Sequence, residues 1–471
     1  MFNIDKEEKM KKVSVWGIIL LMVAVALFAG GRTQRDAFDP SSVTGAFDWR
    51  RAAGTEITVF MVQHPTQEAV IQRLAEFTAL TGIRVNTSIT PEANYFDQVT
   101  NALASRTGTP DVFMSGAYQL WDYLDAGNVE PLDGYLNNPA LTRREYDAAD
   151  FVQSAWNALK WDGVAGNRVG SGHQLGIPLS MEVYLLAYNQ RAFDRAGISG
   201  PPRTYAELLS IVDRLQGWNG PGSYAVAVRG ARDWGTIHPA YMSTFRNFGA
   251  TDLAMEGGRL VSRVNSPESV RMNEFFVDMV RRGGSPQWAS MFWYLCQADF
   301  ENGAAAMFWD ASNALAQTVF RNMPESPHIR YTTSPVANVG DPVHSNFWTW
   351  SIAMNSYSRN KIGAWLFMQY FSSKEFLLSA SVDGNNMDPT RTSVYQNPAF
   401  QRRLDQLPGW YEAWQRTIPN TTILFTPQPA FFATTTEWAA TLQGMVAGTY
   451  PSVQAGLNAL KERQDRLLIH P

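Results

Sequence analysis

The sequence is poor in cysteine and in charge, and each shortage excludes a class of protein. Cys296 is the only cysteine among 471 residues, so an intramolecular disulfide is excluded. No CxxC, HExxH or histidine cluster is present, and we expect neither a metal site nor a cofactor. Charged residues make up 17% of the chain and the formal net charge is −4, which argues against a nucleic-acid partner.

Long apolar runs are also lacking, with one exception near the start. The charged segment Lys6–Lys12 precedes the apolar run Val13–Ala29, an arrangement typical of an export signal. We assign residues 1–31 to a signal or anchor segment and 32–54 to a polar tether. The folded part is then expected in the periplasm or at the outer face of the cytoplasmic membrane. Residue 31 is glycine and not the cysteine that lipidation needs, while cleavage and retention as an anchor both stay open.

Aromatic residues are abundant, at 13% with 16 tryptophans. The chain length suits two domains of roughly 150–200 residues each.

Residues 56–115 are predicted to alternate between strands and helices, with strands at 56–62, 83–89 and 110–115 and helices at 65–80 and 91–106. This alternation predicts a parallel sheet. Ligands of such sheets lie beyond the carboxyl ends of the strands. The candidate contacts there are Gln63, His64, Ser115, Gly116 and Gln119; a helix cap is the alternative role for His64.

The stretch 172–215 contains two strand-like and two helix-like runs. Strands are predicted at 173–180 and 183–188, and a helix starts at the N-cap Asn189 and stops at Gly197. Thr204 and Glu207 fit a capping box, in which each side chain accepts a backbone N–H of the other residue. These signals indicate an α/β fold without naming a function.

Four motifs in a fixed order carry a resemblance to a known family: Thr109-Pro-Asp-Val-Phe-Met-Ser-Gly116, Leu175-Gly-Ile-Pro-Leu-Ser180, Leu186-Ala-Tyr-Asn189 and Pro201-Pro-Arg-Thr-Tyr-Ala-Glu207. Over roughly residues 55 to 465 the chain resembles the family 1 extracellular solute-binding proteins, the maltose-binding-protein-like receptors of ATP-binding-cassette importers. The resemblance implies a two-lobed periplasmic-binding-protein fold of type II, with a mainly parallel sheet flanked by helices in each lobe and a multi-segment hinge.

The resemblance to this family also implies domain boundaries. Lobe 1 would comprise 55–180 and 306–372, and lobe 2 would comprise 181–305 and 373–471. The chain would cross between the lobes at 177–181 and again near residues 305 and 373.

The second group of candidate site residues lies along and beyond the first crossing. Glu182 follows the crossing, and its carboxylate suits sugar hydroxyls, with a hinge salt bridge as the alternative. Tyr184 would share its strand face. Stacking on a sugar ring, or else core packing, is expected of the aromatic candidates. The resemblance and the local composition together select Asp233, Trp234, Trp309, Asp310, Trp348, Trp350, Arg391 and Phe432.

The expected function is that of a monomeric, non-catalytic receptor that closes two lobes around a mono- or oligosaccharide and delivers it to a membrane permease. One alternative is an exported glycoside hydrolase or lyase, for which Glu182 and Asp310 are the only pair of carboxylates to nominate. A ligand-sensing subunit of a membrane sensor is another. Glycerol phosphate or a different polar solute is the alternative ligand.

Overall fold

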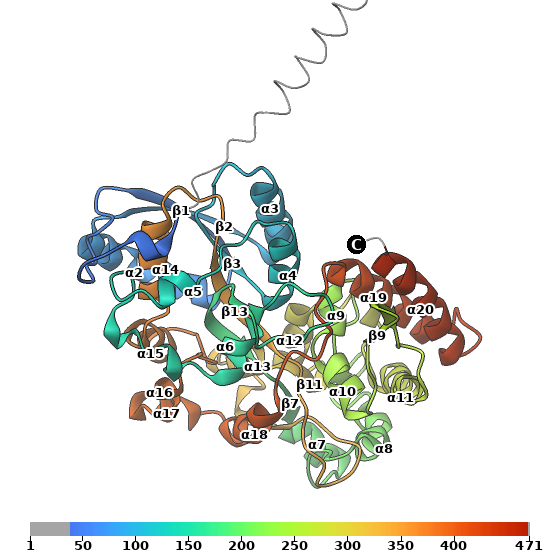
Figure 1. Cartoon of the computed structure of the whole chain (residues 1–471). Coiled ribbons are helices and arrows are strands. Elements are labelled where there is room, and N and C mark those ends of the chain that lie inside the picture. The colour runs from blue at the N-terminus through green and yellow to red at the C-terminus, as the bar shows by residue number, and fades with distance from the viewer. Residues whose placement is uncertain (1–37, 470–471) are drawn as a thin grey trace, which may run out of the picture. The chain divides into compact units, whose positions relative to one another are not determined.

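The computed structural model describes residues 38–469 (Figure 1). The predicted signal segment 1–31 lies outside these residues, and within 38–469 no helix is long and apolar enough to cross a membrane. Residues 38–42 contain one short turn, η1 (Pro40–Ser42), and the chain from residue 43 onward forms one compact unit.

The predicted tether, 32–54, is too long. Residues 43–54 belong to the fold, because Trp49 packs edge-to-face on Tyr370 with ring centroids 6.1 Å apart and the guanidinium of Arg143 lies over the Trp49 ring. Ala52 is buried as well.

The first sheet has the strand order β2-β1-β3-β13-β6. Its strands are β1 (Glu56–Val62), β2 (Arg84–Thr90), β3 (Val112–Ser115), β6 (Ile177–Glu182) and β13 (Trp348–Met354). Strand β1 pairs in parallel with β2 and β3, whereas β13 runs antiparallel to β3 and β6. The connecting helices α2 (Pro65–Thr81) and α3 (Glu92–Ala104) complete the predicted βαβαβ unit, which is confirmed.

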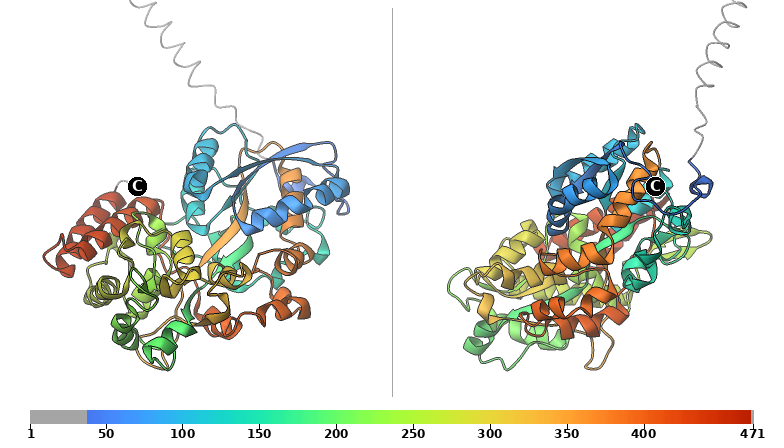
Figure 2. Two further views of the ribbon diagram at one scale, coloured as in Figure 1. Left: turned by 180° about the vertical axis from the view of Figure 1, so that it is seen from behind. Right: turned by 90° about the vertical axis from the view of Figure 1, so that its left-hand side faces the viewer.

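The second sheet has the order β12-β7-β11-β8. Its strands are β7 (Tyr184–Asn189), β8 (Tyr224–Ala227), β11 (Ala305–Ala311) and β12 (Ile329–Thr333). Helices around it include α7 (Gln190–Ala196), α8 (Tyr205–Leu215), α10 (Ala240–Asn247), α11 (Pro267–Gly283), α12 (Trp293–Glu301), α13 (Ser312–Phe320), α19 (Phe431–Ala447) and α20 (Val453–Ile469). Helices α19 and α20, red in Figures 1 and 2, lie beside α11 although they follow it by some 150 residues.

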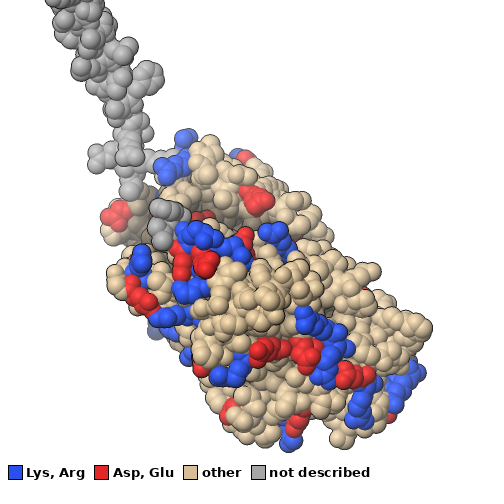
Figure 3. All heavy atoms as spheres, turned by 90° about the vertical axis from the view of Figure 1, so that its right-hand side faces the viewer, with Lys and Arg blue, Asp and Glu red and all other residues tan. Residues whose placement is uncertain are grey.

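The remaining elements are shorter or cover the first sheet: α4 (Ala117–Asp125), α5 (Asp133–Leu136), α6 (Gln153–Ala158), β4 (Lys160–Trp161), β5 (His173–Gln174), α9 (Trp234–Ile237), β9 (Leu253–Glu256), β10 (Arg259–Ser262), α14 (Lys361–Phe371), α15 (Lys374–Val382), α16 (Thr392–Tyr395), α17 (Pro398–Leu404) and α18 (Trp410–Thr417). Helix α14 lies against α2, from a distant part of the chain (Figure 2). On the face drawn in Figure 3, acidic and basic side chains are interspersed.

Two predicted crossings are wrong. The chain was expected to return to lobe 1 near residue 305, but β11 pairs with β7 and β8 in the second sheet. Strand β12 also pairs with β7, so the return takes place between β12 and β13. Which sheet a buried strand joins depends on long-range pairing, and the apolar run 305–311 does not specify its partners.

The third crossing also comes later than residue 373. Isolated bridges join Pro389 to Ser180 and Arg391 to Phe151, and they hold this part of the chain beside the first sheet. Helix α18 is the next element to pack on the second sheet, against β12.

Helix caps follow the sequence closely around 189–207. The side chain of Asn189 accepts the backbone N–H of Arg191 at 3.0 Å, and helix α7 ends at Gly197 with φ 63°. Thr204 Oγ1 accepts the backbone N–H of Glu207 at 3.1 Å, as predicted. The return bond differs, because the Glu207 carboxylate accepts the backbone N–H of Arg203 at 2.7 Å and not that of Thr204.

Replacing the Thr204 cap tests this local account. Thr204→Ala removes the acceptor for one N–H at the start of α8, and we expect the free energy of unfolding to fall by about 1 kcal/mol. Denaturant titration checks this against Thr422→Ala, an exposed threonine whose loss should cost under about 0.5 kcal/mol. Equal values for the two variants would contradict the cap.

Candidate ligand-binding cavity

A cavity of ≈250 Å³ lies between residues carried by the two sheets. The first sheet and its helices contribute His64, Pro65, Glu68, Glu92, Trp348 and Trp350, and the crossing strand β6 contributes Glu182. The second sheet and its helices contribute Arg229, Trp234, His238, Trp293, Gln297, Ala311, Asn313, Ala314, Gln317, Phe320 and Arg321, and Asn385, which follows α15, also lines the cavity.

Aromatic rings form one wall of the cavity. Trp348 and Trp350 alternate along β13 and share a face, as predicted, with ring centroids 5.1 Å apart and planes at 85°. Trp234 lies 5.3 Å from Trp348, across from the first sheet, and His64 lies 5.2 Å from Trp350. This wall offers aromatic surface to the C–H groups of a ligand.

Gly116 makes room for this wall. It caps α4, and a Cβ atom built on it would lie 1.9 Å from Cη2 of Trp348. Any other residue would displace the indole. Gly116 therefore shapes the cavity through Trp348 and is not itself among the lining residues.

One lining residue, Arg229, belongs to a buried ion pair. Arg229 stands two residues after β8 and donates to both carboxylate oxygens of Asp310, from Nε at 2.8 Å and from Nη2 at 2.6 Å. Asp310 is fully buried. Nη1 of Arg229 donates to the carbonyl oxygen of Gly235 at 3.2 Å and to Nε2 of His238 at 3.0 Å.

These bonds assign the tautomer of His238. Because an arginine only donates, Nε2 of His238 accepts, and Nδ1 carries the proton that it donates to the Tyr184 hydroxyl at 2.7 Å. Burial, together with the nearby Arg229 charge, holds the pKa of His238 well below its ordinary value. The imidazole is therefore neutral and adds no charge to the cavity.

Glu182 faces the cavity from the end of β6. Among residues 38–469, no hydrogen bond or salt bridge holds its carboxyl group, so the hinge salt bridge considered for it is not formed. Burial raises the pKa of this carboxyl to about 8. Arg229 opposes the shift, whereas the neighbouring carboxylates Asp310 and Glu92 add to it.

One hydrogen bond crosses the cavity between the two sheets. Nε1 of Trp293, at the start of α12, donates to Oε2 of Glu92 in the first turn of α3 at 3.2 Å. One turn further along α3, Phe96 stacks on Trp350 at 5.9 Å and contacts the Trp234 ring edge-on at 6.1 Å. The first turns of α3 thus contact both sides of the cavity.

His64 caps a helix and also lines the cavity. Its Nδ1 accepts the backbone N–H of Thr66 at 3.2 Å and caps α2, and its ring lines the cavity. Burial lowers the pKa of His64 to about 3, so this ring is neutral too.

Several predicted contacts lie outside the lining. Gln63 is exposed, and Ser115 is buried and donates to the carbonyl of Gly116. Gln119 is buried, and its amide atoms have no hydrogen-bond partner among the described residues. Asp233 caps α9 by accepting the N–H of Gly235 at 2.7 Å. Three more predicted residues support the lining from behind: Tyr184 through His238, Asp310 through Arg229, and Phe432 through its ring contact with Trp234 at 5.5 Å.

The prediction for Trp309 is wrong. Its ring is fully buried on the other face of β11, where Nε1 donates to Ser334 Oγ at 2.8 Å and the ring lies near Tyr205. Since neighbours on a strand point to opposite sides, Asp310 and Trp309 cannot both face the cavity.

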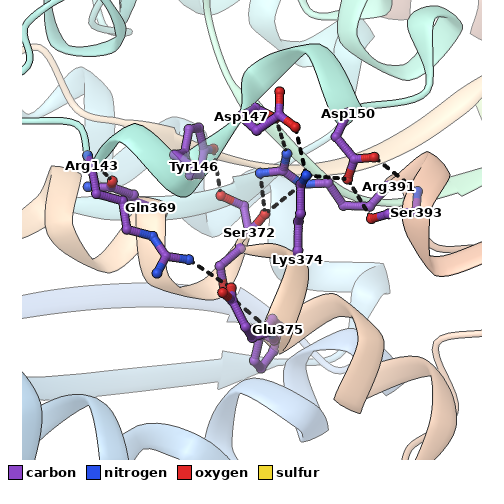
Figure 4. A network of polar contacts seen from close by, with 12 residues as sticks. Arg143, Tyr146, Asp147, Asp150, Gln369, Ser372, Lys374, Glu375, Arg391 and Ser393 are labelled. Atoms are coloured by element: carbon purple, nitrogen blue, oxygen red, sulfur yellow. Dashed lines mark hydrogen bonds and ion pairs between the residues drawn. The ribbon is translucent and has the colours of Figure 1, made fainter. Parts of the chain in front are cut away.

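The prediction that Arg391 faces the cleft is also wrong (Figure 4). Its side chain is fully buried, and it donates to the carbonyl oxygens of Ser372 and Asp147. The guanidinium lies 3.6 Å from the ring centroid of Phe151 and 4.9 Å from that of Tyr146. Arg391 therefore joins two segments of the fold.

Sequence reasoning missed several lining residues, above all Arg229, Glu92 and Trp293. Arg229 was within reach, because it follows a strand of the second sheet and the carboxyl ends of such strands carry ligand contacts. Glu92 and Trp293 start helices, and no local signal indicates that these two helix ends meet.

The two sheets, the crossing strand and the shared cavity define a solute-binding receptor with two lobes. The chain belongs to the bacterial extracellular solute-binding protein family, whose model matches residues 63–376. It is 36% identical over 434 residues to an erythritol/L-threitol-binding protein of Mycolicibacterium smegmatis, covering 91% of this chain and 90% of that protein. It is 26% identical over 330 residues to a mannitol-binding protein of Pseudomonas aeruginosa, covering 69% and 70%.

Solved structures agree on the fold. A solute-binding protein of Agrobacterium radiobacter K84 in complex with ribitol superposes with a TM-score of 0.76 at 20% identity, covering 88% of this chain and 99% of that one. Maltose-bound MalE3 of T. maritima gives 0.74 at 17% identity, covering 88% and 100%. The family match confirms the predicted family and the predicted class, an exported receptor rather than an enzyme. The solved structures confirm the two-lobed fold.

The raised pKa of Glu182 predicts a pH-dependent stability. The folded state holds this proton more tightly than the unfolded state does, so the contribution is present below the unfolded pKa of about 4.3 and is lost as pH rises through about 8. We expect Glu182→Gln to match the wild type in melting temperature near pH 4 and to exceed it by a margin that grows up to about pH 8. Glu274→Gln, an exposed change on α11, should show no such trend, and a constant difference for Glu182→Gln would contradict the shift.

The buried position of Arg391 predicts a structural role. Arg391→Met leaves the carbonyls of Ser372 and Asp147 without donors, and we expect the free energy of unfolding to fall by at least about 2 kcal/mol. The exposed Arg402→Met should change it by under about 0.5 kcal/mol. Ligand affinity measured on the folded Arg391→Met protein should be unchanged; a loss of affinity without a loss of stability would restore the cleft role.

Proposed function

We propose that this receptor binds a short acyclic polyol in the cavity and delivers it to the permease of an ATP-binding-cassette importer. The observation that carries the proposal is the composition of the cavity, in which four indole rings and three glutamates from both sides enclose ≈250 Å³. Drug-sized ligands occupy cavities of roughly 300–1,000 Å³, so a smaller ligand fits this one better. The relatives named for erythritol, L-threitol, mannitol and ribitol support the same ligand class.

The chemistry of the lining suits hydroxyl groups. Carboxyl groups accept hydroxyl hydrogens at Glu182 and Glu92, and the Trp rings cover the C–H faces between the hydroxyls. Because these residues come from both sheets, a ligand that touches them all binds the closed arrangement best and shifts the population toward it.

The alternative ligand, a glycerol phosphate, is disfavoured by charge. Arg229 is paired with Asp310 at 2.6 Å, and Arg321 lies 3.4 Å from Glu301. Among the described lining residues no other arginine or lysine remains to neutralise a phosphate.

We further propose that the protein acts as a monomer, that its closed form docks on the permease, and that residues 1–31 direct export. Family membership supports export and a permease partner. Mass spectrometry of the exported protein distinguishes removal of residues 1–31 from their retention.

A thermal-shift screen tests the ligand class. A ligand that binds only the folded state raises the melting temperature, and we expect erythritol, threitol or ribitol to do so while maltose and glycerol 3-phosphate do not. A shift with glycerol 3-phosphate and none with any polyol would overturn the proposal.

Removing one wall of the cavity tests its location. Trp348→Ala should weaken binding of the best polyol at least about tenfold in calorimetric titration, because a central aromatic contact is lost. Trp218→Ala, which removes a tryptophan outside the lining, is the matched control. Equal affinities for the two variants would place the ligand elsewhere.

A further inference from the structure

Within the part of the chain that the structure describes, the arginines that line the cavity form salt bridges, whereas the glutamates that line it do not. Each lining cation has a carboxylate of its own, Asp310 for Arg229 and Glu301 for Arg321. Neither carboxylate partner belongs to the lining.

The lining glutamates lack cations. Among residues 38–469, Glu68, Glu92 and Glu182 form no salt bridge, and Glu92 receives only the indole N–H of Trp293. The histidines do not compensate, since His64 and His238 are both neutral. The cavity therefore has an excess of carboxyl groups over the positive charge available to them.

A second feature of the cavity also suits a cation. The indole rings of Trp234, Trp348 and Trp350 line the same cavity as Glu182, and an ammonium over an indole face is attracted by the ring quadrupole. Gln297 lines the cavity and is only 1% exposed. Its Nε2 donates to Glu301, whereas its amide oxygen has no hydrogen-bond partner among the described residues. This oxygen is available to a ligand donor.

We propose that the cavity also takes amino-polyols, with the protonated amine held between Glu182 and Glu92 and the remaining hydroxyls placed as in a neutral polyol. This inference rests on the proposed function. It makes Glu182 and Glu92 the residues that determine which ligand charge the receptor accepts.

The positions of the two glutamates couple this charge selection to closure. Glu92 lies at the start of α3 on the first sheet's side, and Glu182 ends the strand that leads into the second sheet. The charge of Glu92 raises the pKa of Glu182, and the charge of Asp310 raises the pKa of both glutamates. A ligand cation between them removes this repulsion and stabilises the arrangement that brings them together.

Calorimetric titration of the full chain with two matched compounds tests the proposal. Erythritol is compared with its 1-amino-1-deoxy derivative, which has an ammonium in place of one terminal hydroxyl. We expect the amine to bind about tenfold more tightly at pH 7. Glu182→Gln and Glu92→Gln should each abolish the preference, whereas Glu274→Gln, on the exposed surface of α11, should preserve it.

Proton release gives a second readout that does not depend on affinity. The ammonium lowers the proton affinity of the neighbouring carboxyl groups, so binding of the amine should release protons at pH 7, seen as a binding enthalpy that changes with the ionisation enthalpy of the buffer. Erythritol should show a smaller buffer dependence, and Glu182→Gln should reduce that of the amine.

The outcomes separate the two claims. If erythritol binds and the amine binds more weakly or not at all, the inference is wrong and the proposed function stands. An amine preference that survives both Glu→Gln changes also overturns it. If neither compound nor any polyol binds, the proposed function fails and the inference fails with it.

Discussion

The buried ion pair between Arg229 and Asp310 holds the ligand cavity together. Both oxygens of Asp310 accept from Arg229, and the remaining Arg229 donors fix the carbonyl of Gly235 and the ring of His238. That geometry sets the start of α9, and with it the position of Trp234. Removal of either partner would leave a buried charge unpaired, which is far more costly than the loss of a surface pair.

The same pair sets the electrostatics of the site. Asp310 neutralises Arg229, so the glutamates that face the cavity keep their negative character or hold a proton, as the raised pKa of Glu182 indicates. A neutral polyol is compatible with either state of Glu182, because a carboxyl group accepts or donates a hydrogen bond as its protonation allows. An anionic ligand is not compatible with the charged state.

The sequence was a good guide wherever a local signal decides the structure. The strand at 56–62, the caps at Asn189 and Thr204, and the shared face of Trp348 and Trp350 were all predicted and all form. Local patterns did not decide which sheet β11 joins, since its residues are buried on both faces. The sequence pattern also does not show which alternate residues of this strand point toward the cavity. Trp309 and Asp310 were therefore both predicted as site residues, although only one of them can point that way.

The remaining failures have a similar cause. Arg391 stands in a turn whose chemistry suits an exposed loop, yet the packing of Phe151 and Tyr146 encloses it. Glu92 and Trp293 are 201 residues apart and meet only when both lobes are in place. Contacts of this kind depend on the tertiary structure and have no signature within either segment.

In the proposed function, one ligand contacts residues of both lobes in this cavity. Hydrogen–deuterium exchange with and without the polyol that raises the melting temperature most tests it directly. We expect slower exchange in the first turns of α3 on one side of the cavity, and at the start of α12 and along α9 on the other. Protection confined to one lobe, or centred on the turn that carries Arg391, would contradict it.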